Sequence, residues 1–315
     1  MNFQHFSTLL VSGSLAYDEI MNFPDTFKEY FDPEKLHQIN ISFVVNKLTK
    51  HLGGTATNIA YNASLYSKKN VAICGAFGKD HQTLSTFLKK HNIDLSHCHF
   101  DKALYTSTGR VITDSADNQI WGYYYGASEH ADEIDLSFVD DSYFIVLSAN
   151  HKHGFLAMQN YCITNQIPYL YDPGMTLTWI DDKDLLEGIQ HAIFLVGNDY
   201  EMGRIYKRLS LVPGEVTKSG TILITTLGKE GAHFQSADET FSVAGYPVKQ
   251  LVDPTGAGDA FRGGLISALR EGASFREAVV VANAIASFVV ESHGTVNHAP
   301  TRSAIAKRIQ QLSIS

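Results

Sequence analysis

The chain has 315 residues, of which 25 are Lys or Arg and 33 are Asp or Glu, so its formal net charge at pH 7 is −8. Hydrophobic residues make up 44% of the chain and charged residues 18%, a balance typical of a folded protein and not of a disordered one. A chain of this length buries enough surface to fold without a metal or a disulfide. The acidic balance argues against nucleic acid or an anionic membrane as a partner, because both attract positive surfaces.

The cysteines and the N-terminus indicate the compartment. Cys74, Cys98 and Cys162 are odd in number and form no CxxC pair, so neither a disulfide framework nor a zinc ribbon is predicted. The first residues lack the basic start and the apolar core of a secretory signal. The longest apolar stretch, 278–290, is interrupted by Asn283 and is shorter than the ~20 residues that span a bilayer. We therefore expect a soluble, cytoplasmic protein.

The first part of the chain alternates between strand and helix patterns, with one long interruption. The expected strands are 8–11 and 71–76, and the expected helices are 57–66 and 82–91. The stretch 18–46 breaks the pattern, with isolated aromatic residues among polar ones and a β-favouring run at 40–45. Residues 110–113 and 119–125 are predicted to form a hairpin across Asp117 and Asn118.

The remainder of the chain repeats a strand-then-helix rhythm. The expected strands are 143–148, 168–171, 192–196 and 221–226, followed by two β-like runs, 232–235 and 240–244, and then by helices. This alternation predicts a mostly parallel sheet with helices on both faces. The β-rich pieces near 18–46 and 105–125 do not fit the rhythm, so we expect them outside that sheet as a small lid.

The strongest local signal is the sequence Asp-Pro-Thr-Gly-Ala-Gly-Asp at 253–259, just before an amphipathic helical pattern. A Gly-rich turn at a helix N-terminus points backbone N–H groups outward at the positive end of the helix dipole, which makes an anion site without lysine. Asp259 falls in the first turn, where it either complements the dipole or positions an acceptor hydroxyl. Phosphoryl transfer through a loose transition state requires mainly such positioning.

Two common phosphate-binding motifs are excluded. No segment matches the Walker A pattern GxxxxGK[ST]. A Rossmann fingerprint requires Gly at the position of Phe261 and should follow the first strand of the sheet. The segment 253–259 is therefore an anion site of another kind.

Two further segments carry residues suited to a ligand. The first, 13–18, follows the first strand, where ligands bind in open α/β sheets, and Asp18 can accept hydrogen bonds from two adjacent hydroxyls of a sugar. The second, 53–58, begins with two glycines that let the backbone approach a ligand, and Asn58 lies one helical turn further on. Each segment can also be explained without a ligand: Asp18 as an exposed aspartate in a loop, and 53–58 as an ordinary turn followed by a capped helix N-terminus.

Together and in this order, the three motifs resemble the PfkB (ribokinase-like) family of ATP-dependent kinases. The Gly-Gly segment and the segment 253–259 correspond to the two signatures of that family, and the resemblance covers nearly the whole chain. Further family landmarks are found at 75–80, 198–201 and 226–231. Within the family, bacterial ribokinase-like adenosine kinases are the most similar in the segments 13–24, Leu36-His37, 41–43 and 118–127.

The resemblance implies an α/β fold: a ribokinase-like three-layer α/β/α domain over residues 1–315, with a mostly parallel central sheet and a small β-sheet lid. The lid would be formed by about 17–50 and 104–128. The implied enzyme is a phosphotransferase with an alcohol group as acceptor. It moves the γ-phosphate of ATP to the 5′-hydroxyl of a nucleoside, with Mg²⁺ and, as in many members, K⁺. The partner is a small-molecule nucleoside or sugar, and the protein is a monomer or a homodimer.

The resemblance also assigns roles to single residues. Asp259 corresponds to the catalytic base, and Gly256, Ala257 and Gly258 correspond to the backbone donors that stabilise the transferring phosphoryl group. The residues that would bind the acceptor are Ser14, Asp18, Ser42, Gly54, Asn58 and Tyr123. Those that would bind ATP are Asn198, Thr226, Gly228, Gly231 and Asn283. Those that would serve metals are Glu201 for Mg²⁺ through water, and Asp253, Thr255 and Gly294 for K⁺.

Three functions remain open from the sequence. The first is a nucleoside kinase, in which Phe23, Tyr123 and Trp179 offer ring faces to a base, although Trp179 can equally pack a loop. The second is the same chemistry on a free sugar such as ribose, because Met175, Thr176 and Trp179 stand where adenosine kinases carry glutamines and an arginine. The third is an inactive ligand-binding protein, against which the intact Asp259 counts.

Overall fold

A computed structural model of the chain describes residues 2–31, 37–38 and 40–314. The strands of this part are β1 (Thr8–Ser12), β2 (Ala16–Asn22), β3 (Lys47–Gly53), β4 (Asn70–Cys74), β5 (Ala76–Phe77), β6 (Ile93–Asp94), β7 (His99–Phe100), β8 (Ser107–Thr113), β9 (Gln119–Tyr124), β10 (Tyr143–Leu147), β11 (Tyr169–Tyr171), β12 (Phe194–Asn198), β13 (Ile222–Thr226), β14 (Ala232–Gln235) and β15 (Thr240–Val243). The α-helices are α1 (Thr55–Tyr66), α2 (Gln82–Lys90), α3 (Lys152–Asn165), α4 (Asp182–His191), α5 (Asp199–Leu209), α6 (Pro213–Lys218), α7 (Ala257–Arg270), α8 (Phe275–Val289) and α9 (Arg302–Ile314).

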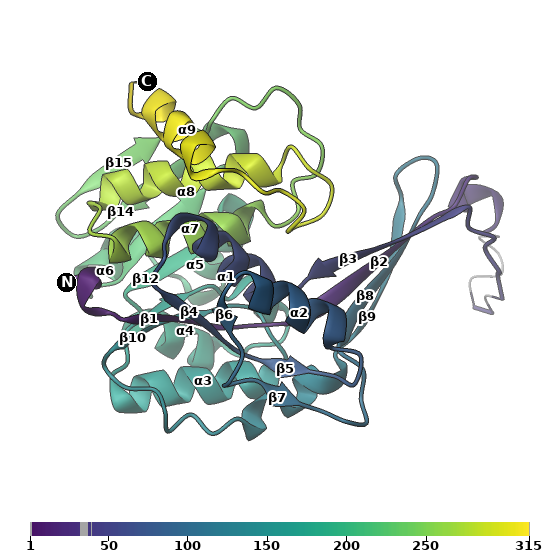
Figure 1. Cartoon of the computed structure of the whole chain (residues 1–315), viewed down its shortest axis with the longest axis horizontal. Coiled ribbons are helices and arrows are strands. Elements are labelled where there is room, and N and C mark those ends of the chain that lie inside the picture. The colour runs from purple at the N-terminus through teal and green to yellow at the C-terminus, as the bar shows by residue number, and fades with distance from the viewer. Residues whose placement is uncertain (1, 32–36, 39, 315) are drawn as a thin grey trace.

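A large sheet forms the centre of the molecule (Figure 1). Among the described residues it has nine strands, in the order β15-β14-β13-β12-β11-β10-β1-β4-β6. All neighbouring strands from β13 to β6 pair in parallel, and β14 and β15 add an antiparallel edge. The predicted mostly parallel sheet is therefore confirmed, and β1 lies third from the edge that β6 forms.

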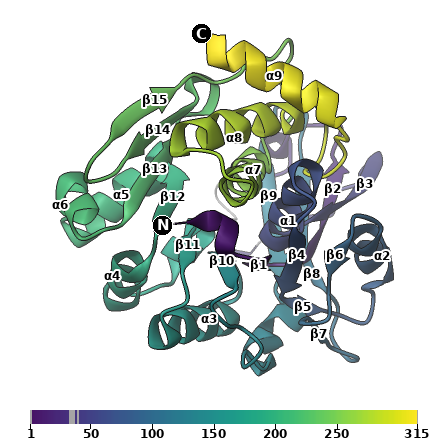
Figure 2. The same ribbon diagram turned by 60° about the vertical axis from the view of Figure 1, so that its left-hand side comes forward.

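Helices cover both faces of the large sheet, as predicted (Figure 2). Neighbouring strand residues point to opposite faces. Leu9 and Phe144 pack with α1, α7 and α8, whereas Leu10 and Ile145 pack with α3, α4 and α5. All four side chains are fully buried. This gives the three layers expected of the fold.

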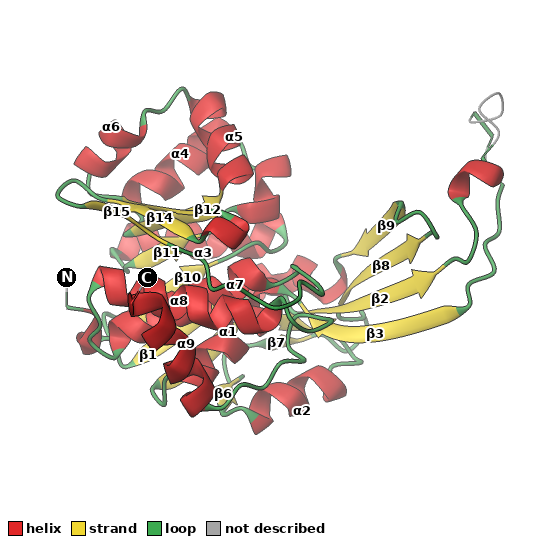
Figure 3. Cartoon of the chain, turned by 90° about the horizontal axis from the view of Figure 1, so that it is seen from above, coloured by secondary structure: helices red, strands yellow, loops and turns green. Residues whose placement is uncertain are grey.

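A second, small sheet projects from one side of this body (Figures 1 and 3). Its four strands, among the described residues, lie in the order β3-β2-β8-β9. Strand β2 runs antiparallel to β3 and parallel to β8, and β8 and β9 form the predicted hairpin. Every residue of β9 is exposed. The small sheet is thus far less buried than the large one.

The prediction for the segment that enters the small sheet is wrong in one respect. The β-favouring run 40–45 contains no strand; the strand begins at Lys47 because its partner β2 ends at Asn22, opposite Lys47. Phe43 packs on the ring of Phe23 instead, with 4.8 Å between ring centroids. Leu36, which belongs to the adenosine-kinase resemblance, lies outside the described residues, as do the rest of 32–36 and residue 39.

The cysteines and the helices agree with a chain that needs no covalent staple. Cys74, Cys98 and Cys162 are free thiols. Burial raises the pKa of the Cys74 thiol to about 12, so that it behaves as a small inert hydrophobic residue. Across the described ranges, no helix combines the length and the apolar character that a bilayer crossing requires.

Candidate active site

A cavity of about 1070 Å³ lies beyond the carboxyl ends of the parallel strands. Its wall includes the residues that follow or end five neighbouring strands, namely Ser14 after β1, Asn150 after β10, Asp172 after β11, Asn198 in β12 and Thr226 in β13. This is the position at which open α/β sheets bind ligands. The strand order of the large sheet thus gathers residues from distant parts of the chain.

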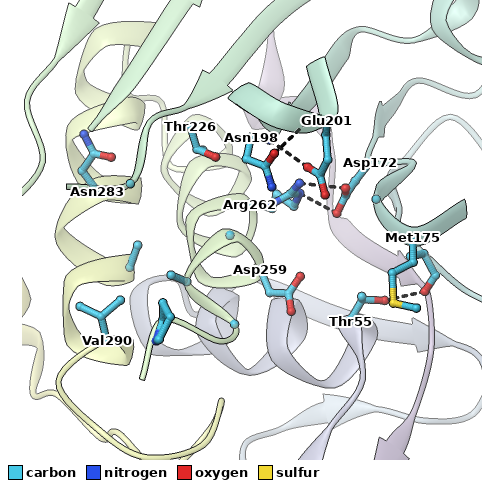
Figure 4. Close-up of a pocket in the computed structure, with 18 of the residues that line it drawn as sticks. Thr55, Asp172, Met175, Asn198, Glu201, Thr226, Asp259, Arg262, Asn283 and Val290 are labelled. Atoms are coloured by element: carbon cyan, nitrogen blue, oxygen red, sulfur yellow. Dashed lines mark hydrogen bonds and ion pairs between the residues drawn. The ribbon is translucent and has the colours of Figure 1, made fainter. Parts of the chain in front are cut away.

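Most of the residues singled out from the sequence line this cavity (Figure 4). Those in its wall are Ser14, Tyr123, Asn198, Glu201, Thr226, Gly228, Gly256, Ala257, Gly258, Asp259 and Asn283. Those outside its wall are Asp18, Ser42, Gly54, Asn58, Gly231, Asp253, Thr255 and Gly294. The second group either supports the wall or lies away from it.

Asp259 is held by the other signature segment. It lies in the first turn of α7, and its Oδ2 accepts a hydrogen bond of 2.8 Å from Nδ2 of Asn58 in α1. Burial raises the pKa of Asp259 to about 6, against the opposing effects of the Arg262 charge and the Asn58 hydrogen bond. A carboxylate with this pKa is ionised at neutral pH and is still basic enough to take a proton.

The turn before Asp259 has the geometry of an anion site. Gly256 caps α7 with φ at +81°, and a Cβ there would lie 2.8 Å from Cγ2 of Thr295, so that only Gly fits. The first amides of a helix have no acceptor in a preceding turn. The amide of Ala257 donates to the carbonyl oxygen of Pro254 at 3.3 Å, and the amides of Gly258 and Asp259 stand next to it at the positive end of α7, at the wall of the cavity.

The two N-terminal segments are joined to each other. A Cβ on Gly54, whose φ is +90°, would lie 2.4 Å from the carbonyl oxygen of Ser14. The Oγ of Ser14 accepts a hydrogen bond of 3.0 Å from the amide of Thr55. Gly54 therefore allows two protein segments to approach each other closely, and it does not itself face the cavity.

Asp18 lies at the base of the small sheet. It stands opposite Gly109 of β8, which stands opposite Tyr123 of β9, a residue of the cavity wall. A Cβ on Gly53 would lie 2.2 Å from Oδ2 of Asp18, so the carboxylate lies directly over that glycine. Burial, followed by the charge of Asp253, raises the pKa of Asp18 to about 6.

Ser42 is not brought to the site. It is exposed in the irregular segment that leads into β3 and does not line the cavity. Its expected role came from the resemblance alone, and the strand that follows this segment, β3, begins only at Lys47.

The residues expected to bind ATP come from three places. Asn198 and Thr226 end β12 and β13, Gly228 and Gly231 follow β13, and Asn283 lies in α8. Asn198 caps α5 by accepting from the Glu201 amide at 2.8 Å, and Oε2 of Glu201 accepts from the Asn198 amide at 2.8 Å. Asn283 donates through Nδ2 to the carbonyl oxygen of Val243 at 3.2 Å. Gly231 lies outside the wall of the cavity. Its φ is +96°, and the absence of a side chain lets its backbone lie close to the carbonyl oxygen of Val243.

The residues expected to bind K⁺ form one small loop cluster. Oδ1 of Asp253 accepts from the amide of Thr255 at 2.9 Å, and Oδ2 accepts from the amide of Gly294 at 3.1 Å. Burial opposes the charge of Asp253, but these amide hydrogen bonds hold its pKa below the usual range. Thr295 next to Gly294 donates to the carbonyl oxygen of Leu52 in β3 at 3.1 Å. The cluster thus joins the start of α7 to the small sheet.

Two residues without a role in the sequence analysis also line the cavity. Arg262 and Asp172 form an ion pair with 2.6 Å between Nε and Oδ2. The sequence held one signal for Arg262: it follows Asp259 by three residues, so the two side chains lie on the same face of the helix. Nothing in the sequence indicated that Asp172, 90 residues away, would be its partner.

Comparison with known proteins decides the family. The model of the pfkB family of carbohydrate kinases matches residues 14–302. The chain belongs to this family. It is therefore a phosphotransferase whose acceptor is an alcohol group, as the sequence predicted.

Relatives with known names span nearly the whole chain. The nucleoside kinase of Methanothermobacter thermautotrophicus is 29% identical over 95% of this chain and 94% of its own length. The structure of Burkholderia thailandensis nucleoside kinase in complex with inosine is 27% identical, has a TM-score of 0.86 and covers 98% of both chains. The ribokinase of Lactococcus lactis is 26% identical over 84% of this chain and 87% of its own.

Proposed function

We propose that this pfkB-family chain is a nucleoside kinase that transfers the γ-phosphate of ATP to the 5′-hydroxyl of a nucleoside. The observation that carries the proposal is the position of Asp259, midway along one cavity whose two ends differ in chemistry (Figure 4). The nucleoside kinase relatives, which match over nearly their full length, support the same function.

One end of the cavity suits the acceptor. Tyr123, Tyr125, Met175 and Trp179 line it, and Met175 is 67% exposed there. Flat and polarisable side chains of this kind stack on a base with little demand on its identity. Beside them, Ser14 offers a hydroxyl, and Asp18 and Asn58 lie close behind the wall, where they would receive the hydroxyls of the ribose.

The other end suits the adenine nucleotide. Ala286 and Val290 on α8 give it an apolar side, and Asn283 on the same helix adds an amide. Thr226 and Gly228 lie between this end and Asp259. A cavity of about 1070 Å³ exceeds the usual volume of a site for one small molecule, which supports two substrates placed end to end.

The reaction then follows from what lies between the two ends. The O5′ atom of the nucleoside attacks the γ-phosphorus, the bond from that phosphorus to the β,γ-bridging oxygen breaks, and ADP leaves. Asp259 takes the proton of the attacking hydroxyl, with Asn58 holding its carboxylate in place. The turn Gly256–Gly258 supplies N–H groups to the charge that develops on the phosphoryl oxygens.

Mg²⁺ fits the residues present. Within the described ranges, no group of three or more metal-binding side chains gathers. A magnesium ion that arrives with ATP needs only one or two carboxylates, since phosphates and waters complete its shell. Glu201 supplies one carboxylate in the cavity wall, and the ion would neutralise charge on the phosphates. The Asp253, Thr255 and Gly294 cluster is the place we propose for K⁺.

The small sheet is proposed to act as a lid over the acceptor. Tyr123 on β9 and Asp18 on β2 both belong to it, so its movement toward the body would bring them onto the nucleoside and exclude water. A monomer and a homodimer are both compatible with this role.

The second candidate is a sugar kinase acting on ribose. The ribokinase relative favours it, and the chemistry at Asp259 would be the same. A free sugar, however, has no aromatic base to stack on the faces of Tyr125 and Trp179. We therefore place it second.

The test is an assay of ADP release with purified protein, ATP and Mg²⁺, with and without K⁺, against a panel of nucleosides and free sugars. We expect turnover with nucleosides and much weaker turnover with ribose. Turnover with ribose but with no nucleoside would refute the proposal and select the sugar kinase. Product analysis should locate the phosphate on the 5′ oxygen.

A further inference from the structure

A buried ion pair forms part of the wall between the two ends of the cavity (Figure 4). Arg262 lies in α7, and Asp172 follows β11; their exposed fractions are 5% and 3%. Nε of Arg262 lies 2.6 Å from Oδ2 of Asp172, and Nη2 donates to Oδ1 at 2.8 Å. The first of these contacts is an ion pair without hydrogen-bond geometry and the second is a hydrogen bond, and together they hold the guanidinium group against the Asp172 carboxylate.

The third nitrogen of the guanidinium faces the anion turn. Nη2 also donates to the carbonyl oxygen of Val196 at 3.4 Å, whereas Nη1 has no protein acceptor among the residues that the structure describes. A Cβ built on Gly258 would lie 2.7 Å from Nη1. The unused donor therefore stands beside the turn Gly256–Gly258, on the same helix as Asp259.

The charges around Arg262 show that it remains a cation. Burial disfavours its charge, but the carboxylates of Asp172, Asp259 and Glu201 raise the pKa of Arg262 above its usual value. A buried ion pair contributes little to stability compared with well-packed apolar residues. An ion pair at this place in the wall of a cavity, with Nη1 free of any hydrogen bond to the described residues, calls for a role other than stability.

We propose that Arg262 is a catalytic residue, whose Nη1 donates to an oxygen of the γ-phosphoryl group during its transfer, and that Asp172 is the positioning residue that aims it. The inference rests on the proposed function. The bonds that form and break are those of the kinase reaction: O5′ to phosphorus forms, phosphorus to the bridging oxygen breaks, and the proton passes to Asp259. Arg262 keeps its own protons throughout.

The chemistry of the transfer explains why a guanidinium suits this place. A loose transition state spreads negative charge over three equatorial oxygens, and arginine donors fixed in advance stabilise that charge. Lys229 is the other cationic side chain of the cavity wall, and it lies in the turn 228–230, toward the nucleotide end. Arg262 is the cation next to Asp259.

The test replaces Arg262 by Lys and by Ala and measures steady-state kinetics with a nucleoside that the wild type uses. We expect Arg262→Lys to lower kcat by about 10²–10³-fold, because the ammonium cannot keep the fork on Asp172 and also reach the phosphoryl group. The KM for the nucleoside should change far less. Added guanidinium ion should restore part of the activity of Arg262→Ala, and urea at the same concentration should not.

Asp172 supplies a second, independent measurement. Asp172→Asn should lower kcat less than Arg262→Lys does, and the double variant should be no slower than Arg262→Lys alone, since both changes remove the same contact. If the Arg262 variants do not fold, Asp172→Asn still carries the test. A kcat for Asp172→Asn equal to that of the wild type overturns the inference.

The control is the other buried arginine of α7. Arg270 is fully buried at the far end of the helix and donates to the carbonyl oxygens of Phe6 and Ser7, at 3.3 and 2.6 Å. Arg270→Lys should lower the melting temperature and leave kcat unchanged below it. If the wild type phosphorylates nucleosides and Arg262→Lys keeps its kcat, the inference is wrong and the proposed function stands. If no nucleoside is a substrate, the proposed function itself fails.

Discussion

The body and the small sheet of this molecule differ in how deeply their strands are buried. In the body, strands such as β10 are buried on both faces, and helices clamp the large sheet from two sides. In the small sheet, all six residues of β9 are exposed, including Trp121 and Tyr124. Buried strands resist local opening, whereas strands with few buried contacts open and move at low cost.

The proposed roles follow this difference between the body and the small sheet in part. Asp259 and the turn Gly256–Gly258 belong to the body, where their positions are fixed by packing of α7 on α1 and α8. Asp18 and Tyr123 belong to the small sheet. The difference teaches that the proposed bond-making groups lie in the buried body, whereas the groups proposed to receive the acceptor come from both parts: Asp18 and Tyr123 from the small sheet, and Ser14 and Asn58 from the body.

The largest expected effect is at Asp259. Asp259→Asn removes the proton acceptor of the body without changing the shape of the site, so kcat should fall by about 10²–10⁴-fold. The KM for the nucleoside should change little, because the acceptor is held mainly elsewhere. Steady-state kinetics of ADP release measure both values.

A matched control for Asp259 exists on another helix. Asp199 also lies in the first turn of a helix, but it is exposed and outside the cavity wall. Asp199→Asn should leave kcat unchanged. A near-normal kcat for Asp259→Asn would show that Asp259 is not the proton acceptor, and the contrast between the body and the small sheet would then not apply to the bond-making step.

The next effect is at Asp18 in the small sheet. Asp18→Ala should weaken nucleoside binding by about 1.5–3 kcal/mol, through loss of charged hydrogen bonds to hydroxyls, with a smaller change in kcat. This corresponds to a rise in KM of roughly 10- to 150-fold. If the KM for ATP rises instead, the small sheet does not hold the acceptor.

The smallest effect is on the pH profile. Burial first of all raises the pKa values of Asp259 and Asp18, each to about 6. Each group is useful only when ionised, so kcat/KM should fall as the pH drops through about 6, with a slope that reports two protons. Asp18→Asn should leave a one-proton slope that belongs to Asp259. A two-proton slope that persists in this variant would show that Asp18 is not one of the two groups.

The sequence predicts the body well and the small sheet only in part, because it indicates the hairpin β8–β9 but neither β2 nor β3. Strands such as Thr8–Ser12 have an unbroken apolar centre, Leu9–Val11, because both of their faces are covered, and this pattern is local. Strand β3, Lys47–Gly53, contains two lysines and a histidine, and its place depends on pairing with β2. Such pairing is a long-range property, so the sequence indicated the β-favouring run at 40–45 and not the strand that forms at Lys47–Gly53.

The same distinction applies to the site. The turn Gly256–Gly258 and Asp259 are one local motif, and their role could be inferred from their order. The contact of Arg262 with Asp172 joins α7 to the end of β11, and no spacing along the chain encodes it. The sequence therefore predicts which residue types matter, and the fold decides which of them touch.

The hydrogen bond between Asn58 and Asp259 has a consequence for the synthesis of the protein. Its two partners are 201 residues apart, and Arg270 on the same helix reaches back to Ser7, 263 residues away. A nascent chain that ends before α7 therefore lacks both the proposed base and the arginine that binds the residue just before its first strand. Such a truncated chain therefore cannot carry out the proposed transfer, even though the strands up to β15 precede the break.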